Sequence, residues 1–142
     1  MQKTIKLNYN KLQKQLAKMD KIAKENNWIF SYEEDTDSLY FSPKKIERRF
    51  KLHSLNDEMS IYIDNNTNLG GVFIEYYKAN LATHEEVFKD FKNVFTKHEE
   101  GFLVIAKKNK KKEAILLKLL KENLMTTVSL EPSHNATHFI PA

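Results

Sequence analysis

The sequence contains no cysteine among its 142 residues, which excludes a disulfide framework and a cysteine nucleophile. Glycine and proline occur only three times each, and two of the glycines form the adjacent pair Gly70 and Gly71. No P-loop, dinucleotide-binding fingerprint or G-x-S-x-G motif is present. The sequence therefore predicts no catalytic residue, no cofactor and no bound metal.

Long apolar runs are missing as well. No stretch of about 18 apolar residues exists, so we expect no membrane-spanning helix and no membrane partner. The first residues, MQKTIKLNYNKL, lack the apolar core of a secretory signal, which favours a cytoplasmic protein. The chain is 41% hydrophobic and 30% charged, a composition typical of a folded soluble protein. Its length predicts a single domain over residues 1–142, with a loosely attached tail at 131–142.

The spacing of apolar residues predicts an N-terminal helix followed by a sheet. With Asn8 or Asn10 as its N-cap, this helix has an apolar face, and its opposite face carries a stripe of lysines: Lys11, Lys14, Lys18 and Lys21. Five segments rich in aromatic and β-branched residues follow, at 28–32, 38–42, 48–53, 59–64 and 71–77. The connections of about five residues favour an antiparallel meander.

Alternation along these strands predicts one apolar face that helices must cover. The residues expected on it are Trp28, Phe30, Tyr32, Leu39, Phe41, Phe50, Leu52, Ile61, Ile63, Val72, Ile74 and Tyr76. The other face is expected to carry Lys51, His53, Ser60 and Glu75, with the aromatic side chains of Tyr40, Tyr62, Phe73 and Tyr77.

The second half of the chain predicts further helices and strands. Thr83 and Glu86 have capping-box spacing, which indicates a helix that continues through Phe95. A strand at 101–106, a helix from Asn109 to about residue 123 and a strand at 125–130 follow. The predicted fold class is α+β: an N-terminal helix and a five-stranded antiparallel meander, then helix, strand, helix and strand.

The central third of the chain contains a short motif, D-x-D-x-L-Y, followed by strands with an acidic turn and then G-V-x-I-E. The matching positions are Asp35, Asp37, Leu39, Tyr40, Asp64, Gly71, Val72, Ile74 and Glu75. Over residues 32–82 this pattern resembles a family of small, uncharacterised bacterial β-meander domains. The resemblance implies a twisted antiparallel meander and supplies no activity.

Charge is distributed unevenly along the chain. Residues 1–27 and residues 101–125 each contain seven lysines and two acidic residues, whereas residues 28–100 contain nine basic and fourteen acidic residues. Five of the six residues from Lys107 to Lys112 are lysines, at the predicted start of a helix. Positive charge there opposes the helix dipole, so either a bound anion relieves the conflict or water and salt screen an exposed turn.

These charges favour a small non-catalytic binding protein whose leading partner is a polyanion, with nucleic acid first. The predicted contacts are Lys107, Lys108, Lys110, Lys111 and Lys112, the stripe Lys11, Lys14, Lys18 and Lys21, and the arginine pair Arg48 and Arg49. Arginine is suited to bidentate contact with phosphate, but the sequence favours the alternative, in which one arginine pairs with a nearby carboxylate and the other is solvated.

Two other functions remain open. The leucine-rich third helix is either a core helix or the docking face of a regulator, inhibitor or homo-oligomer, with Leu116, Leu117 and Leu120 as contacts. A metal-dependent nuclease would use Asp64, Glu75 and Lys78, but the sequence places Glu75 and Lys78 on opposite strand faces, and Asp64 suits a hairpin turn.

Two weaker sequence patterns concern possible metal sites. His134 and His138 have helical metal-ligand spacing without an acidic partner, so no zinc site is predicted. The acidic residues 33–37 lack the glycine and terminal glutamate of a calcium loop, which favours a solvated turn.

Overall fold

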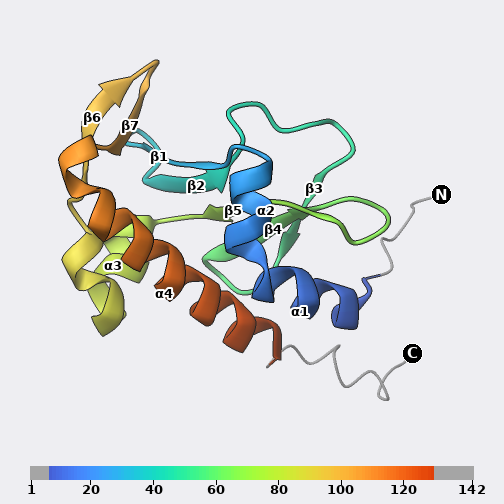
Figure 1. Cartoon of the computed structure of the whole chain (residues 1–142). Coiled ribbons are helices and arrows are strands. Elements are labelled where there is room, and N and C mark those ends of the chain that lie inside the picture. The colour runs from blue at the N-terminus through green and yellow to red at the C-terminus, as the bar shows by residue number, and fades with distance from the viewer. Residues whose placement is uncertain (1–6, 130–142) are drawn as a thin grey trace.

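The computed structural model describes residues 7–129 and contains helices packed on a seven-stranded antiparallel sheet, which confirms the α+β class (Figure 1). The α-helices are α1 (Tyr9–Ala17), α2 (Met19–Glu25), α3 (Ala82–His84) and α4 (Lys110–Ser129). The strands are β1 (Ile29–Glu33), β2 (Ser38–Ser42), β3 (Lys51–Ser54), β4 (Met59–Ile63), β5 (Leu69–Ile74), β6 (Phe95–Glu99) and β7 (Phe102–Ile105). Short helical turns are η1 (Tyr77–Leu81), η2 (Glu86–Phe91) and η3 (Lys107–Asn109).

The strand order, β3-β4-β5-β2-β1-β7-β6, corrects the predicted five-stranded meander. The strands β3, β4 and β5 are sequential neighbours, but β2 pairs with β5 instead of β3. This pairing aligns Leu39 with Ile74 and Phe41 with Val72, so apolar residues of both strands share one face. The segment 43–50 crosses from the centre of the sheet to its edge, and the hairpin β6–β7 extends the sheet beyond β1.

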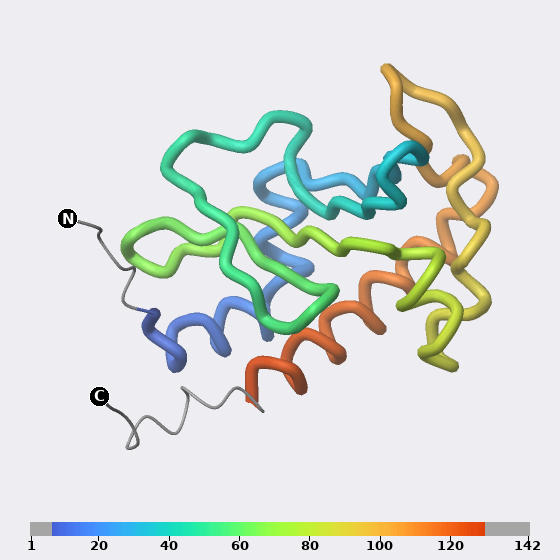
Figure 2. Tube along the Cα trace, turned by 180° about the vertical axis from the view of Figure 1, so that it is seen from behind, coloured from blue at the N-terminus to red at the C-terminus, as the bar shows by residue number. Residues whose placement is uncertain are grey.

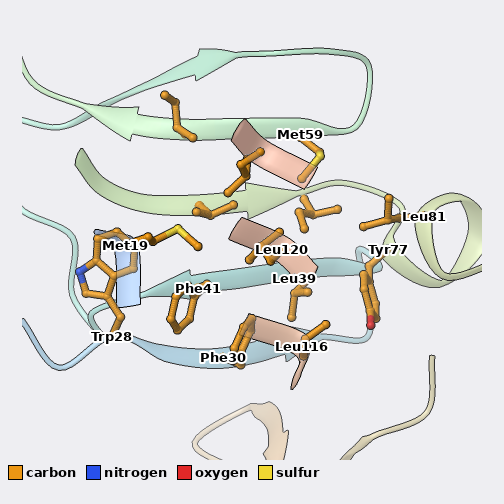
Figure 3. Packing of buried hydrophobic residues seen from close by; sticks show 14 of the residues in the cluster. Met19, Trp28, Phe30, Leu39, Phe41, Met59, Tyr77, Leu81, Leu116 and Leu120 are labelled. Carbon is orange, nitrogen blue, oxygen red and sulfur yellow. The ribbon is translucent and has the colours of Figure 1, made fainter. Parts of the chain in front are cut away.

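The predicted apolar face is confirmed for most strands, and helices cover it. Its side chains pack against α1, α2 and α4, and Figure 3 shows Leu116 of α4 beside Phe30 and Leu120 beside Leu39. Leu12 and Leu16 of α1 and Met19 of α2 are fully buried in the same core. Burial of each such side chain contributes about 1.5–3 kcal/mol to stability, so this apolar interface holds the two layers together.

Three residues predicted on that face lie elsewhere. Leu52 pairs with Tyr62 in the β3–β4 ladder, so it lies on the opposite face and is half exposed, while His53 pairs with Ile61 on the covered side. A shift of one residue moves every side chain of a strand to the other face. Phe50 precedes β3, and Tyr76 turns outward in a left-handed conformation after β5 ends.

The N-terminal helix begins as predicted, because the side chain of Asn8 accepts a hydrogen bond from the N–H of Lys11 at 3.0 Å. It is interrupted at Lys18, which separates α1 from α2. The predicted capping box at Thr83 is wrong, since the hydroxyl of Thr83 donates instead to the carbonyl of Lys78 at 2.5 Å. Glu85 is extended, so short turns replace the expected helix, and Phe95 begins β6.

The strand predicted at 125–130 is also wrong, because α4 remains helical to Ser129. Leu116, Leu120, Leu124 and Val128 recur every four residues and are all buried, which favours one long helix over the β propensity of the threonines. The hydroxyls of Thr126 and Thr127 donate to carbonyls four residues earlier, at 3.0 and 2.8 Å.

Candidate functional site

The helical segments 7–25 and 107–129 cover one face of the sheet and are called here the basic layer. They contain twelve lysines and four acidic residues. Residues 26–106, which include all the strands among residues 7–129, contain nine basic and fourteen acidic residues. These two helical segments and the rest of the described chain therefore carry opposite excess charge, and the sequence segments predicted to be basic are brought onto one side of the sheet.

Most of the predicted lysines are exposed on the basic layer. These are Lys14, Lys18, Lys21, Lys107, Lys108, Lys110, Lys111 and Lys112, together with Lys24 and Lys118. Lys11 is different, because its ammonium group donates to the carbonyl of Asn66 at 2.7 Å and the side chain is half buried. Lys110 pairs with Glu113 at 3.2 Å, an exposed contact that contributes little to stability.

The two lysine-rich segments lie at opposite ends of α4. The 20 residues of α4 span about 30 Å, and the helix runs from the side of the β6–β7 hairpin to α1 (Figure 1). Gln13 of α1 donates to the hydroxyl of Ser129 at 3.4 Å, which places α1 against the last turn of α4. Lys121 and Asp20, 3.4 Å apart, connect α4 to α2, and an open groove of about 480 Å³ runs beside them.

The arginine pair does not join this layer. Arg49 lies 3.3 Å from Asp64 and 3.3 Å from Glu47, and its guanidinium carbon is 4.6 Å from the ring centre of Phe50. The guanidinium therefore has two carboxylate partners and an aromatic neighbour. Arg48 is exposed on the same segment, between β2 and β3.

The three residues considered for a nuclease, Asp64, Glu75 and Lys78, do not lie together in the structure. Asp64 is buried at the start of the β4–β5 turn, where its carboxylate accepts from the N–H groups of Asn66 and Asn68 at 2.9 and 2.8 Å. Glu75 follows the far end of β5, whose six residues span about 20 Å. Lys78 lies over the ring of Tyr32, at 4.9 Å. Within residues 7–129, no cluster of His, Asp and Glu could hold a metal ion. His134 and His138 lie outside the described residues.

The leucines proposed as partner contacts belong mainly to the core. Leu116 and Leu120 are each 1% exposed, and Leu117 is half buried at the groove beside α2. The outward face of α4 instead presents Lys111, Ile115 and Lys118, which are spaced at i, i+4 and i+7 and are all exposed.

The opposite side of the sheet, called here the open face, has no helix over it in the described part of the chain (Figure 2). The rings of Tyr40 and Phe73 lie 5.0 Å apart there, and Phe102 packs edge-on against Tyr40 at 6.2 Å. The outward positions predicted for Tyr40, Tyr62 and Phe73 agree with their half-buried state, but Tyr77 is buried, and its hydroxyl donates to the carbonyl of Phe91 at 2.7 Å.

A cavity of about 290 Å³ opens on this face, and sequence reasoning did not find it. Ile29, Tyr40, Ile46, Phe102 and Val104 supply its apolar walls. At its edge Lys44 lies 3.9 Å from Glu99 and 4.0 Å from Glu100. A second hollow of about 320 Å³ shares Tyr40 and is lined by Glu33 and Glu75. Burial, together with the nearby charge of Glu33, raises the pKa of the Tyr40 hydroxyl, which therefore stays neutral.

The residues of the β-meander motif have structural partners. The carboxylate of Asp37 accepts hydrogen bonds from Tyr32, Lys78 and Ala79, which ties the β1–β2 turn to η1. A Cβ atom at Gly71 would lie 2.8 Å from the Cβ of Ser42, and one at Gly70 would lie 2.5 Å from the ring of Phe50. The glycine pair thus permits close packing, and the motif explains local structure, not chemistry.

Comparison of the chain with protein-family models, with curated proteins and with solved structures found no match. Among the helices of residues 7–129, none has the length and apolar character needed to cross a membrane.

Proposed function

We propose that this protein is a non-catalytic nucleic-acid-binding protein whose contact surface is the basic layer. The observation that carries the proposal is the separation of charge between the basic layer, which contains twelve lysines and four acidic residues, and residues 26–106, which contain an acidic excess. Lysines that neutralise phosphates release condensed counterions, and this release supplies most of the affinity of non-specific binding.

The dimensions of the layer fit an extended polyanion. The length of α4, about 30 Å, corresponds to about nine base pairs of B-DNA. A duplex along this helix would meet the exposed cluster from Lys107 to Lys112 at one end and the lysines of α1 at the other, with α2 beside Lys121 between them. The open face fits nucleic acid less well, because Glu33, Glu75, Glu99 and Glu100 border its hollows beside the single Lys44.

The test is fluorescence anisotropy with a labelled duplex and a single strand at about 50 and about 200 mM salt. One variant changes Lys110, Lys111 and Lys112 to alanine. The matched control removes three lysines outside the basic layer, by changing Lys44, Lys45 and Lys97 to alanine. We expect affinity to fall with salt, and the log–log slope to flatten by about 0.7–0.9 for each lost phosphate contact in the first variant only.

Two results would contradict the proposal. Absence of binding at the lower salt concentration would remove nucleic acid as the partner. An equal loss of nucleic-acid affinity in both triple variants would show that net charge alone, and not the basic layer, controls binding. Circular dichroism of each variant separates either result from loss of folding.

A further inference from the structure

We propose that the cavity on the open face receives the outward side of α4 from a second copy of this chain, so that copies associate head to tail. This contact requires no nucleic acid. On one copy it uses the open face, which the proposed function leaves unused, and on the other copy it uses part of the basic layer. The occupant is identified by two matching patterns of charge and apolar surface on the same molecule.

The first pattern is on α4. Ile115 is 51% exposed and is one of four large hydrophobic side chains that are strongly exposed among residues 7–129; the others are Leu52, Tyr76 and Val87. Of these positions, only Ile115 belongs to the basic layer. Lys111 and Lys118 lie on the same face of the helix, one turn before and one turn after it. The helix therefore presents an apolar knob between two cations.

The second pattern is its complement on the open face. The cavity has apolar walls that include Ile29, Phe102 and Val104, and its edge carries Glu99 and Glu100. Glu99 has long contacts with Lys44 at 3.9 Å and with Lys97 at 3.8 Å, whereas Glu100 has a contact at 4.0 Å with Lys44 and is 77% exposed. An incoming lysine can therefore pair with them. Apolar burial at the centre of a contact with charged pairs at its rim is the usual arrangement of a protein interface.

The geometry of the contact is heterologous, because the helix surface of one copy meets the sheet surface of the next. A heterologous contact leaves an unused helix at one end and an unused cavity at the other, so association continues beyond the dimer unless the rotation closes a ring. The contact also places a helix on the open face, which then has helices on both sides of the sheet.

The experiment is sedimentation velocity of the full chain without nucleic acid, over a hundredfold range of protein concentration. We expect the mean mass to rise with concentration at about 50 mM salt and to return to that of the monomer at about 500 mM salt. Ile115→Ser should weaken association at least tenfold, whereas Val87→Ser, which removes an equally exposed side chain outside the basic layer, should leave it unchanged.

Charge-reversal variants test the pairing of lysines with glutamates directly. A helix variant carries Lys111→Glu and Lys118→Glu, and a sheet variant carries Glu99→Lys and Glu100→Lys. Each should be monomeric alone, because like charges then face each other. An equimolar mixture, or all four changes in one chain, should associate again. Restored association would also show that both variants are folded.

A monomeric wild-type protein at the lower salt concentration would overturn the proposal. Association that persists in both charge-reversal variants would overturn it as well, since it would indicate a different contact surface. Neither result depends on nucleic-acid binding, so the two proposals succeed or fail separately.

Discussion

The hydroxyl of Tyr32 donates a 2.6 Å hydrogen bond to Asp37, and the same carboxylate accepts from the backbone N–H groups of Lys78 and Ala79 at 2.8 and 3.0 Å. Asp37 has a positive φ of 54°, a conformation that aspartate tolerates better than most residues. One acidic side chain thus joins two parts of the chain that are 41 residues apart in sequence.

Asp37→Ala is expected to lower the free energy of unfolding by about 2–4 kcal/mol, because two backbone donors and a buried tyrosine lose their acceptor. Urea denaturation measures the change. Asp35→Ala, in the same turn but exposed, should change stability by less than about 0.5 kcal/mol. Equal effects of the two substitutions would show that the hydrogen bonds of Asp37 do not stabilise the fold.

Asp64 predicts a dependence of stability on pH. Burial raises the pKa of its carboxyl, but hydrogen bonds from Asn68 and Asn66 and the charge of Arg49 outweigh burial, so the pKa lies below its usual value. A group with a lowered pKa in the folded state stabilises the protein above its unfolded pKa of about 3.9, and this contribution is lost as the pH falls through the folded pKa.

Asp64→Asn is therefore expected to be less stable than wild type at neutral pH, and the difference should shrink as the pH falls below about 4, near the unfolded pKa, and on through the lower folded pKa. Urea denaturation at several pH values measures it. Arg49→Gln should give an intermediate loss, because it removes only one of the groups that stabilise the carboxylate. A difference that stays constant with pH would mean that Asp64 acts through the shape of the turn and not through its charge.

Gly70→Ala tests the packing of the segment 43–50 on the sheet. The added Cβ atom would lie 2.5 Å from Cδ1 of Phe50, so the ring or the strand must move. We expect a loss of about 1–3 kcal/mol, measured by thermal denaturation. In a double-mutant cycle with Phe50→Ala, the combined loss should be smaller than the sum of the single losses, whereas additive losses would contradict the clash.

Lys111→Glu and Lys112→Glu should each stabilise the isolated protein by about 0.3–1 kcal/mol, because a negative charge in the first turn complements the helix dipole. The same changes should weaken binding to a duplex. Thermal denaturation without ligand and anisotropy with ligand measure the two effects. A loss of stability on either substitution would mean that these lysines have stabilising partners in the folded chain.

The sequence predicted those parts of the fold that follow from short-range alternation and capping. Phe30 and Tyr32 face the core because β1 alternates, and Asn8 caps α1 because its side chain reaches the third residue of the helix. The strand order was not predictable, since it depends on which apolar faces align across non-adjacent strands. Leu52 illustrates the limit: its strand register is set by its pairing with Tyr62, which local sequence does not encode.

The sequence predicted α4 to end near residue 123, and the helix is longer for a similar reason. Thr126 and Thr127 favour a strand locally, but burial of Leu124 and Val128 in the core favours the helix. The basic character of the candidate surface was visible as two lysine-rich segments, whereas their position on one layer required the structure. The cavity could not be predicted, because Ile29, Ile46 and Phe102 meet there only through tertiary packing.

The opposite excess charges of the basic layer and of residues 26–106 also contribute an electric dipole moment to the molecule, directed across the sheet. A nearby row of phosphates would exert a torque on this dipole and turn the basic layer toward itself before any contact forms. Acidic residues such as Glu99 and Glu100, which touch no phosphate in the proposed complex, would then influence how quickly productive encounters occur. Residues remote from the nucleic-acid interface would thereby contribute to the rate of association.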